Sequence, residues 1–229
     1  MKDISLIAFD ADDTLWECQT YFEAVEKEYC ELLKSYASAD EISKALFAVE
    51  TANMPLLGYG SKAFLLSLLE NAIEVSGRRL KADEVEKIIK LGKELLQLPG
   101  KPMDGVEETL KVLRERGEYH LVVFTKGELL DQENKFHRSG LKPYFDDIIV
   151  VSDKTEASYY QLCERFSINV EQLLMVGNSF RSDIEPVLKL GGWAAHIPFH
   201  TTWQHEVVEE YEHPHLLKLE YFTQLKQVL

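Results

Sequence analysis

The segment that most constrains the fold is the short apolar run at residues 4–9. It shows little alternation between apolar and polar side chains, and it ends at Asp10. Strands that are buried on both faces have this pattern, and they occur mainly in parallel sheets that helices cover on both sides. The sequence therefore predicts a buried parallel strand with an acidic residue at its carboxyl end.

The next eighty residues have a different period. Between residues 20 and 98 apolar side chains recur every three or four positions, and no strand pattern interrupts them. Helical spacing begins at Tyr21 and continues to Tyr36, and further helices are expected at 41–53, 61–75 and 83–98. The helix at 41–53 should stop before Pro55, because a residue that precedes proline disfavours the helical region. Residues 18–98 are thus predicted to form an all-helical cap inserted after the first strand.

Strands and helices alternate in the rest of the chain. Strands are expected at 120–124, 147–151, 172–176 and 193–197, the last of them the final strand, and helices are expected at 105–116, 128–139, 155–166 and 183–190. This alternation implies a parallel sheet with right-handed crossovers. The predicted fold class is therefore α/β, with a Rossmann-like parallel sheet core formed by residues 1–17 and 99–229.

Polar residues follow four of the expected strands, where a parallel sheet brings them to one edge. They are Asp10, Asp12, Thr125, Lys126, Lys154, Asn178 and Asp183. A carboxylate can attack phosphorus, and a second acid two residues later can protonate the leaving oxygen. A hydroxyl and an ammonium group can hold the phosphoryl oxygens, and clustered oxygen ligands suit Mg²⁺. The set indicates phosphoryl transfer.

Four short motifs in order along the chain carry a family resemblance. FDADDTL resembles the DxDxT motif of the haloacid dehalogenase (HAD) superfamily, and FTKG, SDKT and GNSFRSDIEP resemble its second, third and fourth motifs. A helical block between the first and second motifs is typical of the helical-cap, phosphatase-like subclass. The resemblance covers nearly the whole chain, and it implies Mg²⁺ as cofactor.

The resemblance also implies roles for individual residues. Asp10 would be the nucleophile and a metal ligand, and Asp12 the general acid/base, with its backbone carbonyl also on the metal. Thr125 and Lys154 would bind the phosphoryl group, with Lys126 as a further phosphate-binding candidate. Dehalogenases of the superfamily lack the second acid, so Asp12 favours phosphate chemistry.

The fourth motif departs from the family pattern. Asn178 stands where the family often has an acid, so a bound metal would meet less negative charge there. We expect Asn178 to be a direct metal ligand and Asp183 a direct or water-bridged one.

Composition narrows the choice of partner. The formal net charge of −14 disfavours nucleic acid and anionic lipid as partners. No apolar run approaches the roughly 20 residues that span a bilayer, the first residues lack a signal-peptide pattern, and three cysteines without ligand spacing suit a reducing compartment. We expect a cytoplasmic protein that acts on a small phosphorylated metabolite; the sequence does not indicate its oligomeric state.

Several neighbouring residues have a structural interpretation. Asp13 is expected to accept backbone hydrogen bonds in a turn, and Lys135 to be a surface charge. Trp16, Glu17 and Gln19 fall where the family has a flap, and are candidates for gating or substrate contact. The histidines after residue 195 show no spacing that favours a zinc site.

Three alternative functions stay open at this point. A phosphomutase would use the same residues and return the phosphoryl group to an isomerised sugar. A catalytically weak phosphate-binding protein would fit the amide at Asn178. A phospho-accepting receiver domain also combines Asp, Thr and Lys on a parallel sheet, although such domains are shorter and carry no helical insertion.

Overall fold

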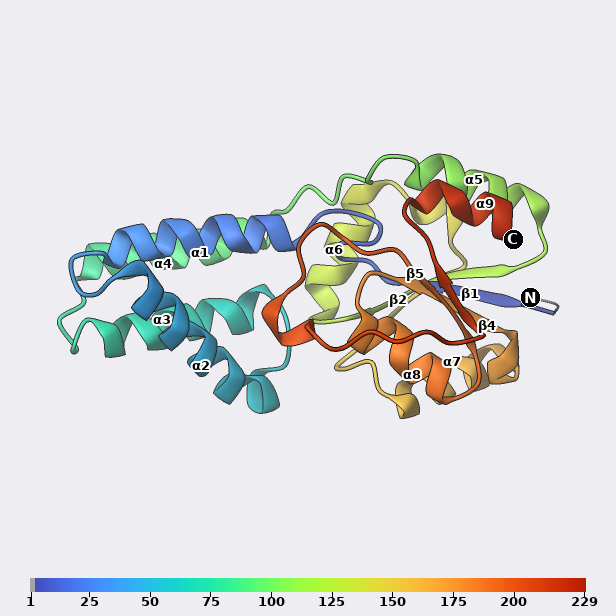
Figure 1. Ribbon diagram of the computed structural model, residues 1–229. Coiled ribbons are helices and arrows are strands. Elements are labelled where there is room, and N and C mark those ends of the chain that lie inside the picture. The colour runs from blue at the N-terminus through green and yellow to red at the C-terminus, as the bar shows by residue number, and fades with distance from the viewer. Residues whose placement is uncertain (1–2) are drawn as a thin grey trace. The chain divides into compact units, whose positions relative to one another are not determined.

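A computed structural model describes residues 3–229 of the chain. It divides into two compact units, Met1–Gln19 with Pro99–Leu229, and Thr20–Leu98. We call the first the core unit and the second the helical unit (Figure 1). The chain passes from the first unit to the second between Gln19 and Thr20, two residues later than the sequence-based division at residue 17.

The core unit contains one parallel sheet. Its strands are β1 (Leu6–Phe9), β2 (His120–Lys126), β3 (Asp147–Val151), β4 (Leu173–Gly177), β5 (Trp193–His196) and β6 (Leu216–Lys218). They are ordered β3-β2-β1-β4-β5-β6, and every neighbouring pair is parallel. The predicted α/β Rossmann-like fold is confirmed. β1 lies between β2 and β4, so Asp10 emerges near the middle of the sheet edge.

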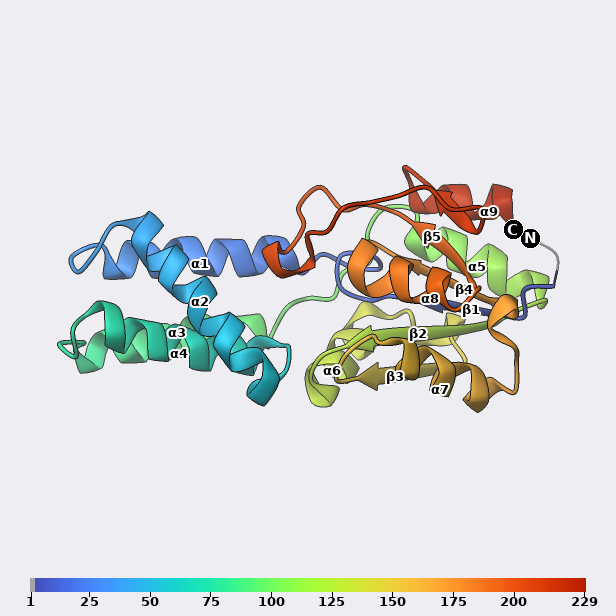
Figure 2. The ribbon, with the colours of Figure 1, turned by 60° about the horizontal axis from the view of Figure 1, so that its bottom comes forward.

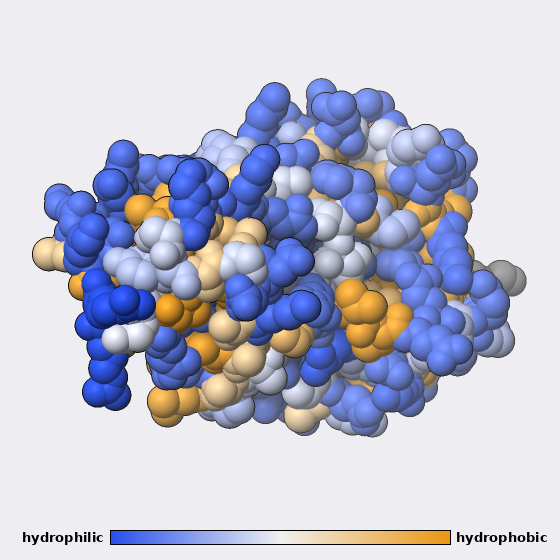
Figure 3. All heavy atoms as spheres, turned by 60° about the vertical axis from the view of Figure 1, so that its left-hand side comes forward, coloured by the Kyte–Doolittle hydropathy of each residue, from blue (hydrophilic) through white to orange (hydrophobic). Residues whose placement is uncertain are grey.

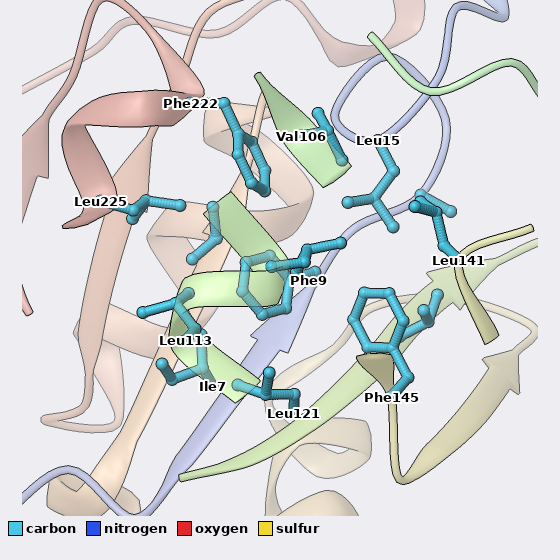
Figure 4. Close-up of a cluster of buried hydrophobic side chains, with 14 of the residues drawn as sticks. Ile7, Phe9, Leu15, Val106, Leu113, Leu121, Leu141, Phe145, Phe222 and Leu225 are labelled. Carbon is cyan, nitrogen blue, oxygen red and sulfur yellow. The ribbon is translucent and has the colours of Figure 1, made fainter. Parts of the chain in front are cut away.

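Helices cover both faces of this sheet (Figure 2). They are α5 (Val106–Arg116), α6 (Leu129–Ser139) and α9 (Leu225–Val228) with one hydrophobic cluster, and α7 (Glu156–Phe166) and α8 (Glu185–Lys189) with another. Alternate residues of β1 enter the two clusters: Ile7 and Phe9 join the first, Leu6 and Ala8 the second. Figure 4 shows Phe9 among side chains from α5, α9 and the loop at Phe145. This two-sided burial accounts for the apolar run that the sequence showed.

The expectation that residues 193–197 form the final strand is wrong. Leu216–Lys218 adds β6 to the edge of the sheet, parallel to β5, with Ala195 opposite Leu217. Three residues at a sheet edge, two of them half-buried and one exposed, carry too short a pattern to be recognised from sequence.

The helical unit contains α1 (Gln19–Leu33), whose first residue belongs to the core unit, and α2 (Ala39–Leu57), α3 (Ser61–Val75) and α4 (Ala82–Leu95). α2 begins at a capping box between Ser38 and Glu41. The expectation that this helix stops before Pro55 is wrong, because the proline falls in its last turn and only two helical residues follow it. α4 ends at Leu95, three residues earlier than expected.

Figure 3 shows one face of the surface, on which apolar residues form groups among hydrophilic ones. Among residues 3–229 no helix combines the length and the apolar character that crossing a membrane requires.

Candidate active site

The turn after β1 positions the first two acids. The backbone N–H of Asp10 donates to the Val176 carbonyl at 2.9 Å, which continues the pairing of β1 with β4. Asp13 has a φ of 63°, and its carboxylate accepts hydrogen bonds from the backbone N–H groups of Cys18 and Gln19 at 2.8 and 3.0 Å. The structural role predicted for Asp13 is confirmed, and it fixes the path of the turn that carries Asp10 and Asp12.

Lys154 joins two of the predicted acids. Its Nζ lies 2.5 Å from Oδ1 of Asp10 and 2.6 Å from Oδ1 of Asp183. The Lys154 and Asp183 side chains are 1% exposed and that of Asp10 is 10% exposed, so solvent reaches Asp10 alone. The first, third and fourth motifs therefore meet at one point.

Thr14 links Asp10 to the fourth motif by a second route. Its Oγ1 lies 3.1 Å from Oδ2 of Asp10 and 3.2 Å from Oδ1 of Asn178. The side-chain oxygen of Asn178 thus faces the nucleophile candidate. His196, at the end of β5, lies 3.0 Å from the Asn178 backbone carbonyl and supports this loop from the other side.

The short π-helix after β4, Phe180–Ile184, has room for the Asp183 side chain only because residue 177 is glycine. A Cβ atom at Gly177 would lie 2.2 Å from Oδ2 of Asp183, closer than any non-bonded approach permits. That same oxygen accepts the backbone N–H of Ser179 at 3.0 Å. A larger residue at 177 would therefore displace the carboxylate that shares Lys154 with Asp10.

Burial and neighbouring charges set the electrostatics of this cluster, which we call the Lys154 cluster (Asp10, Lys154 and Asp183). Burial raises the pKa of Asp10 to about 7; Lys154 opposes that rise and the negative charge of Asp183 adds to it. Burial alone would lower the pKa of Lys154, but the two carboxylates outweigh it and raise the pKa. Two acids share one cation, so the cluster has an excess of negative charge that a bound cation would relieve.

Asp12 belongs to a separate group, which we call the Asp12 cluster (Asp12, Trp16, Gln132 and Lys135). Lys135 Nζ lies 2.8 and 2.7 Å from the two carboxylate oxygens. Trp16 Nε1 donates to Oδ1 and Gln132 Nε2 donates to Oδ2, both at 2.8 Å. Burial would raise the pKa of Asp12, but these donors, Lys135 foremost, hold it below its usual value.

Two expectations about this region are wrong. Lys135 is not a surface charge, because its side chain is 3% exposed and pairs with Asp12. Trp16 is fully buried and holds Asp12 by its indole N–H, so it is not a mobile flap residue. Glu17 is exposed, and Gln19 has its backbone N–H on Asp13. Both errors arise because the fold turns the 12–16 segment inward against α6.

Thr125 and Lys126 end β2 with different surroundings. Thr125 is buried, and its hydroxyl lies 3.4 Å from the Lys126 carbonyl. Lys126 forms an ion pair with Glu206 and contacts Ser182 Oγ at 3.0 Å. Phosphate binding by Thr125 and Lys126 stays a prediction.

Glu206 is a buried residue that sequence reasoning missed. Besides Lys126, its carboxylate accepts hydrogen bonds from the hydroxyls of Ser179 and Ser182, which follow β4. It lies in a short 3₁₀ helix after β5, Gln204–Glu206, which has too few residues to show a helical period. Gln132 and Lys135 were also missed, although they lie on the buried face of α6 with Phe136.

The oxygen ligands at this edge fit Mg²⁺. Lys154 connects Asp10 with Asp183, and Thr14 connects Asp10 with Asn178. The Asp12 backbone carbonyl lies two residues from Asp10 along the chain. Among residues 3–229 no group of three or more His, Cys, Asp and Glu side chains has metal-binding geometry, so this set provides only two carboxylates. Mg²⁺ in phosphoryl-transfer sites is commonly held by one or two carboxylates with water and phosphate oxygens, so the ligands present are sufficient.

The chain matches a known protein family over most of its length. A model of the haloacid dehalogenase-like hydrolase family matches residues 4–191. The chain belongs to this family. A haloacid dehalogenase-like family hydrolase from Xanthomonas campestris has a solved structure that is 34% identical, covers 99% of this chain and 90% of its own, and superposes with a TM-score of 0.89.

Two further similar proteins are named for different activities. Haloacetate dehalogenase H-2 from Moraxella sp. (strain B) is 28% identical over 185 residues, which is 78% of this chain and 79% of that protein. The structure of a predicted phosphoglycolate phosphatase from Haemophilus somnus 129PT is 19% identical with a TM-score of 0.64, covering 100% of this chain and 99% of its own, and shows the shared fold alone. The chain is therefore a hydrolase of the HAD-like family, and the proteins similar to it include both a dehalogenase and a predicted phosphatase.

Proposed function

We propose that this HAD-family hydrolase is a Mg²⁺-dependent phosphatase that cleaves a small phosphate monoester through an aspartyl-phosphate on Asp10. The observation that carries the proposal is the convergence of Asp10, Lys154 and Asp183 at one point of the sheet edge. A second acid, Asp12, follows Asp10 by two residues. By family resemblance, carbon–halogen hydrolysis does not need the second acid.

The chain's own residues account for two half-reactions. In the first, an oxygen of Asp10 attacks phosphorus and the bond from phosphorus to the ester oxygen breaks. Asp12, which this role requires to be protonated in the substrate complex, gives its proton to the departing alkoxide. In the second, Asp12 takes a proton from water as the water oxygen attacks phosphorus, which frees Asp10 and inorganic phosphate. Lys154 and Thr125 would hold the phosphoryl oxygens, where charge develops.

Mg²⁺, when bound, would neutralise phosphate charge and screen the dianion from the attacking carboxylate. Asp10, Asp183 and Asn178 would hold it, together with the Asp12 backbone carbonyl. The excess negative charge of the Lys154 cluster supports this assignment.

A second candidate function is hydrolysis of a carbon–halogen bond. Two observations favour it: the similarity to haloacetate dehalogenase H-2, and an amide at Asn178 where a metal-dependent member often has an acid. Asp10 would then attack carbon and expel halide, with no proton required from Asp12.

One assay separates the two candidates. The purified protein is incubated with a panel of phosphate monoesters and, separately, with chloro-, bromo- and fluoroacetate, with Mg²⁺ or with EDTA, and phosphate and halide release are measured. We expect phosphate release that needs Mg²⁺ and disappears in Asp10→Asn. Halide release that persists in EDTA and in Asp12→Asn would replace phosphatase with dehalogenase. Isomerised sugar phosphate without net phosphate release would instead indicate a mutase.

A further inference from the structure

The Glu206 carboxylate lies where three segments of the core unit meet. One of its oxygens pairs with Lys126 at the end of β2, and the other accepts the hydroxyls of Ser179 and Ser182, which follow β4. Glu206 itself belongs to the 3₁₀ helix after β5, and its side chain is only 9% exposed. The contacts of this enclosed carboxylate therefore connect the ends of β2 and β4 to the segment that follows β5.

Both serine hydroxyls direct their proton at Glu206. Ser179 Oγ accepts the backbone N–H of Ser182 at 3.0 Å, and Ser182 Oγ accepts from Lys126 Nζ at 3.0 Å. A hydroxyl has a single proton to donate, and in each serine that proton goes to the carboxylate. All the partners of Glu206 in this group are thus donors, and a carboxylate, which only accepts, matches them.

The two serines are direct neighbours of the two metal-ligand candidates of the fourth motif. Ser179 follows Asn178, and Ser182 precedes Asp183. The backbone N–H of Ser179 also donates to Oδ2 of Asp183 at 3.0 Å. This segment forms a single π-helical turn, an uncommon form that often occurs at functional sites. Glu206 therefore holds the chain on both sides of the ligands, one hydrogen-bonded residue away from them.

We propose that Glu206 is a positioning residue for the metal site: by holding the two serines, it sets where Asn178 and Asp183 present their oxygens to Mg²⁺. The inference rests on the proposed function, which requires Mg²⁺ at this edge of the sheet. Residues that orient metal ligands matter nearly as much as the ligands, and losing one typically weakens metal binding by about 10- to 100-fold. Because Asn178 contributes no charge, the placement of the Asp183 carboxylate carries more of the affinity.

Metal binding in the absence of substrate tests this role directly. Mn²⁺ takes the same oxygen ligands as Mg²⁺, and its electron paramagnetic resonance signal falls on binding, so a titration of the whole chain gives a Kd without turnover. The amide of Glu206→Gln must turn an N–H toward one of the donors around it. We expect this variant to bind Mn²⁺ about 10-fold more weakly. Glu209→Gln, which removes an exposed carboxylate three residues later, should bind like the wild type.

A double-mutant cycle separates positioning from a simple effect of charge. Glu206→Gln also removes the carboxylate that pairs with Lys126, and an added positive charge there would itself repel a metal ion. Changing Ser179 and Ser182 together to alanine removes the hydroxyls and leaves every charge in place. We expect this serine variant to weaken Mn²⁺ binding about 10-fold by itself, and Glu206→Gln to add less than 2-fold to it. Unchanged affinity in the serine variant, or losses that multiply, would overturn the inference.

Circular dichroism in EDTA checks that each variant is folded. The serine variant tests the inference by itself if Glu206→Gln does not fold, because the serine variant keeps the buried ion pair. Wild-type affinity in Glu206→Gln would refute the positioning role alone. Absence of Mn²⁺ binding in the wild type, or binding that Asp10→Asn and Asp183→Asn leave unchanged, would refute the metal assignment of the proposed function, and the inference with it.

Discussion

The two lysine-centred clusters at the sheet edge differ in the donors that surround their carboxylates. Each lysine faces two carboxylates, since Lys135 also lies 3.7 Å from Asp131. In the Lys154 cluster the pKa of Asp10 rises to about 7. In the Asp12 cluster, Gln132 and Trp16 add donors to that of Lys135, and the pKa of Asp12 falls. All acceptor sites of Asp12 are thus filled, so we call its cluster complete and the Lys154 cluster, which a cation could still join, incomplete.

Removing the ammonium group of Lys154 should have the largest effect on activity and on stability. Lys154→Met leaves Asp10 and Asp183 close together in a buried place, with no charge to offset them. We expect phosphate release to fall by about 10³-fold or more, because the phosphoryl group also loses its cation. The metal-free protein should lose about 3–5 kcal/mol in its free energy of unfolding, measured by urea denaturation. A loss of less than 10-fold would exclude Lys154 from the phosphoryl site.

The two acids should affect stability with opposite signs in the metal-free protein. The folded pKa of Asp10 is raised from 3.8 to about 7, so ionisation costs stability as pH rises through this window. Asp10→Asn should therefore stabilise the metal-free protein at pH 8 by on the order of 2 kcal/mol, with no difference below about pH 4. The pKa of Asp12 is lowered, so its contribution is present above pH 3.8 and is lost as the pH falls through its folded pKa.

Asp12→Asn should accordingly destabilise the protein at pH 8, by about 3 kcal/mol, since buried Lys135 loses the closer of its two carboxylate partners. Urea denaturation in EDTA at several pH values measures both variants against the wild type. Destabilisation by both variants at pH 8 would remove the contrast between the two clusters.

Mg²⁺ should distinguish the clusters by its effect on the melting temperature. A ligand that binds only the folded state stabilises it by about 2.7 kcal/mol at 100 times its dissociation constant. We expect this gain in the wild type and in Asp12→Asn, which keeps its backbone carbonyl. It should be largely lost in Asp183→Asn, which removes one of the two carboxylate ligands. The reverse order of the two variants would place the metal at Asp12.

The sequence predicted the fold and the Lys154 cluster better than it predicted the Asp12 cluster. Asp10, Lys154 and Asp183 follow strands in a parallel sheet, and that topology alone brings them to one edge. Gln132 and Lys135 approach Asp12 only through the way α6 packs against the turn at Trp16, which a strand-end pattern does not contain. Their polar character also conceals them, because a buried lysine looks like a surface residue until its partner is known.

Lys126 is the third lysine at this sheet edge, and a change to its partner should have the smallest effect on activity. It tests whether the difference between the Lys154 and Asp12 clusters extends to this pair. Lys126 pairs with Glu206, whose carboxylate also accepts the hydroxyls of Ser179 and Ser182 next to Asp183. Burial would raise the pKa of Glu206, but Lys126 and the two serines hold it below its usual value, so this carboxylate, like that of Asp12, is surrounded by donors.

Glu206→Gln keeps the shape of the side chain and removes its charge. We expect a decrease in kcat/KM of about 3- to 10-fold that is equal for alkyl and aryl esters, because the residue supports the loop of Asp183 and does not act through Asp12. Glu209→Gln, at an exposed position three residues later, serves as the control. A decrease confined to alkyl esters would mean that Lys126 and Glu206 act on the leaving group. That role would then not belong to the Asp12 cluster alone.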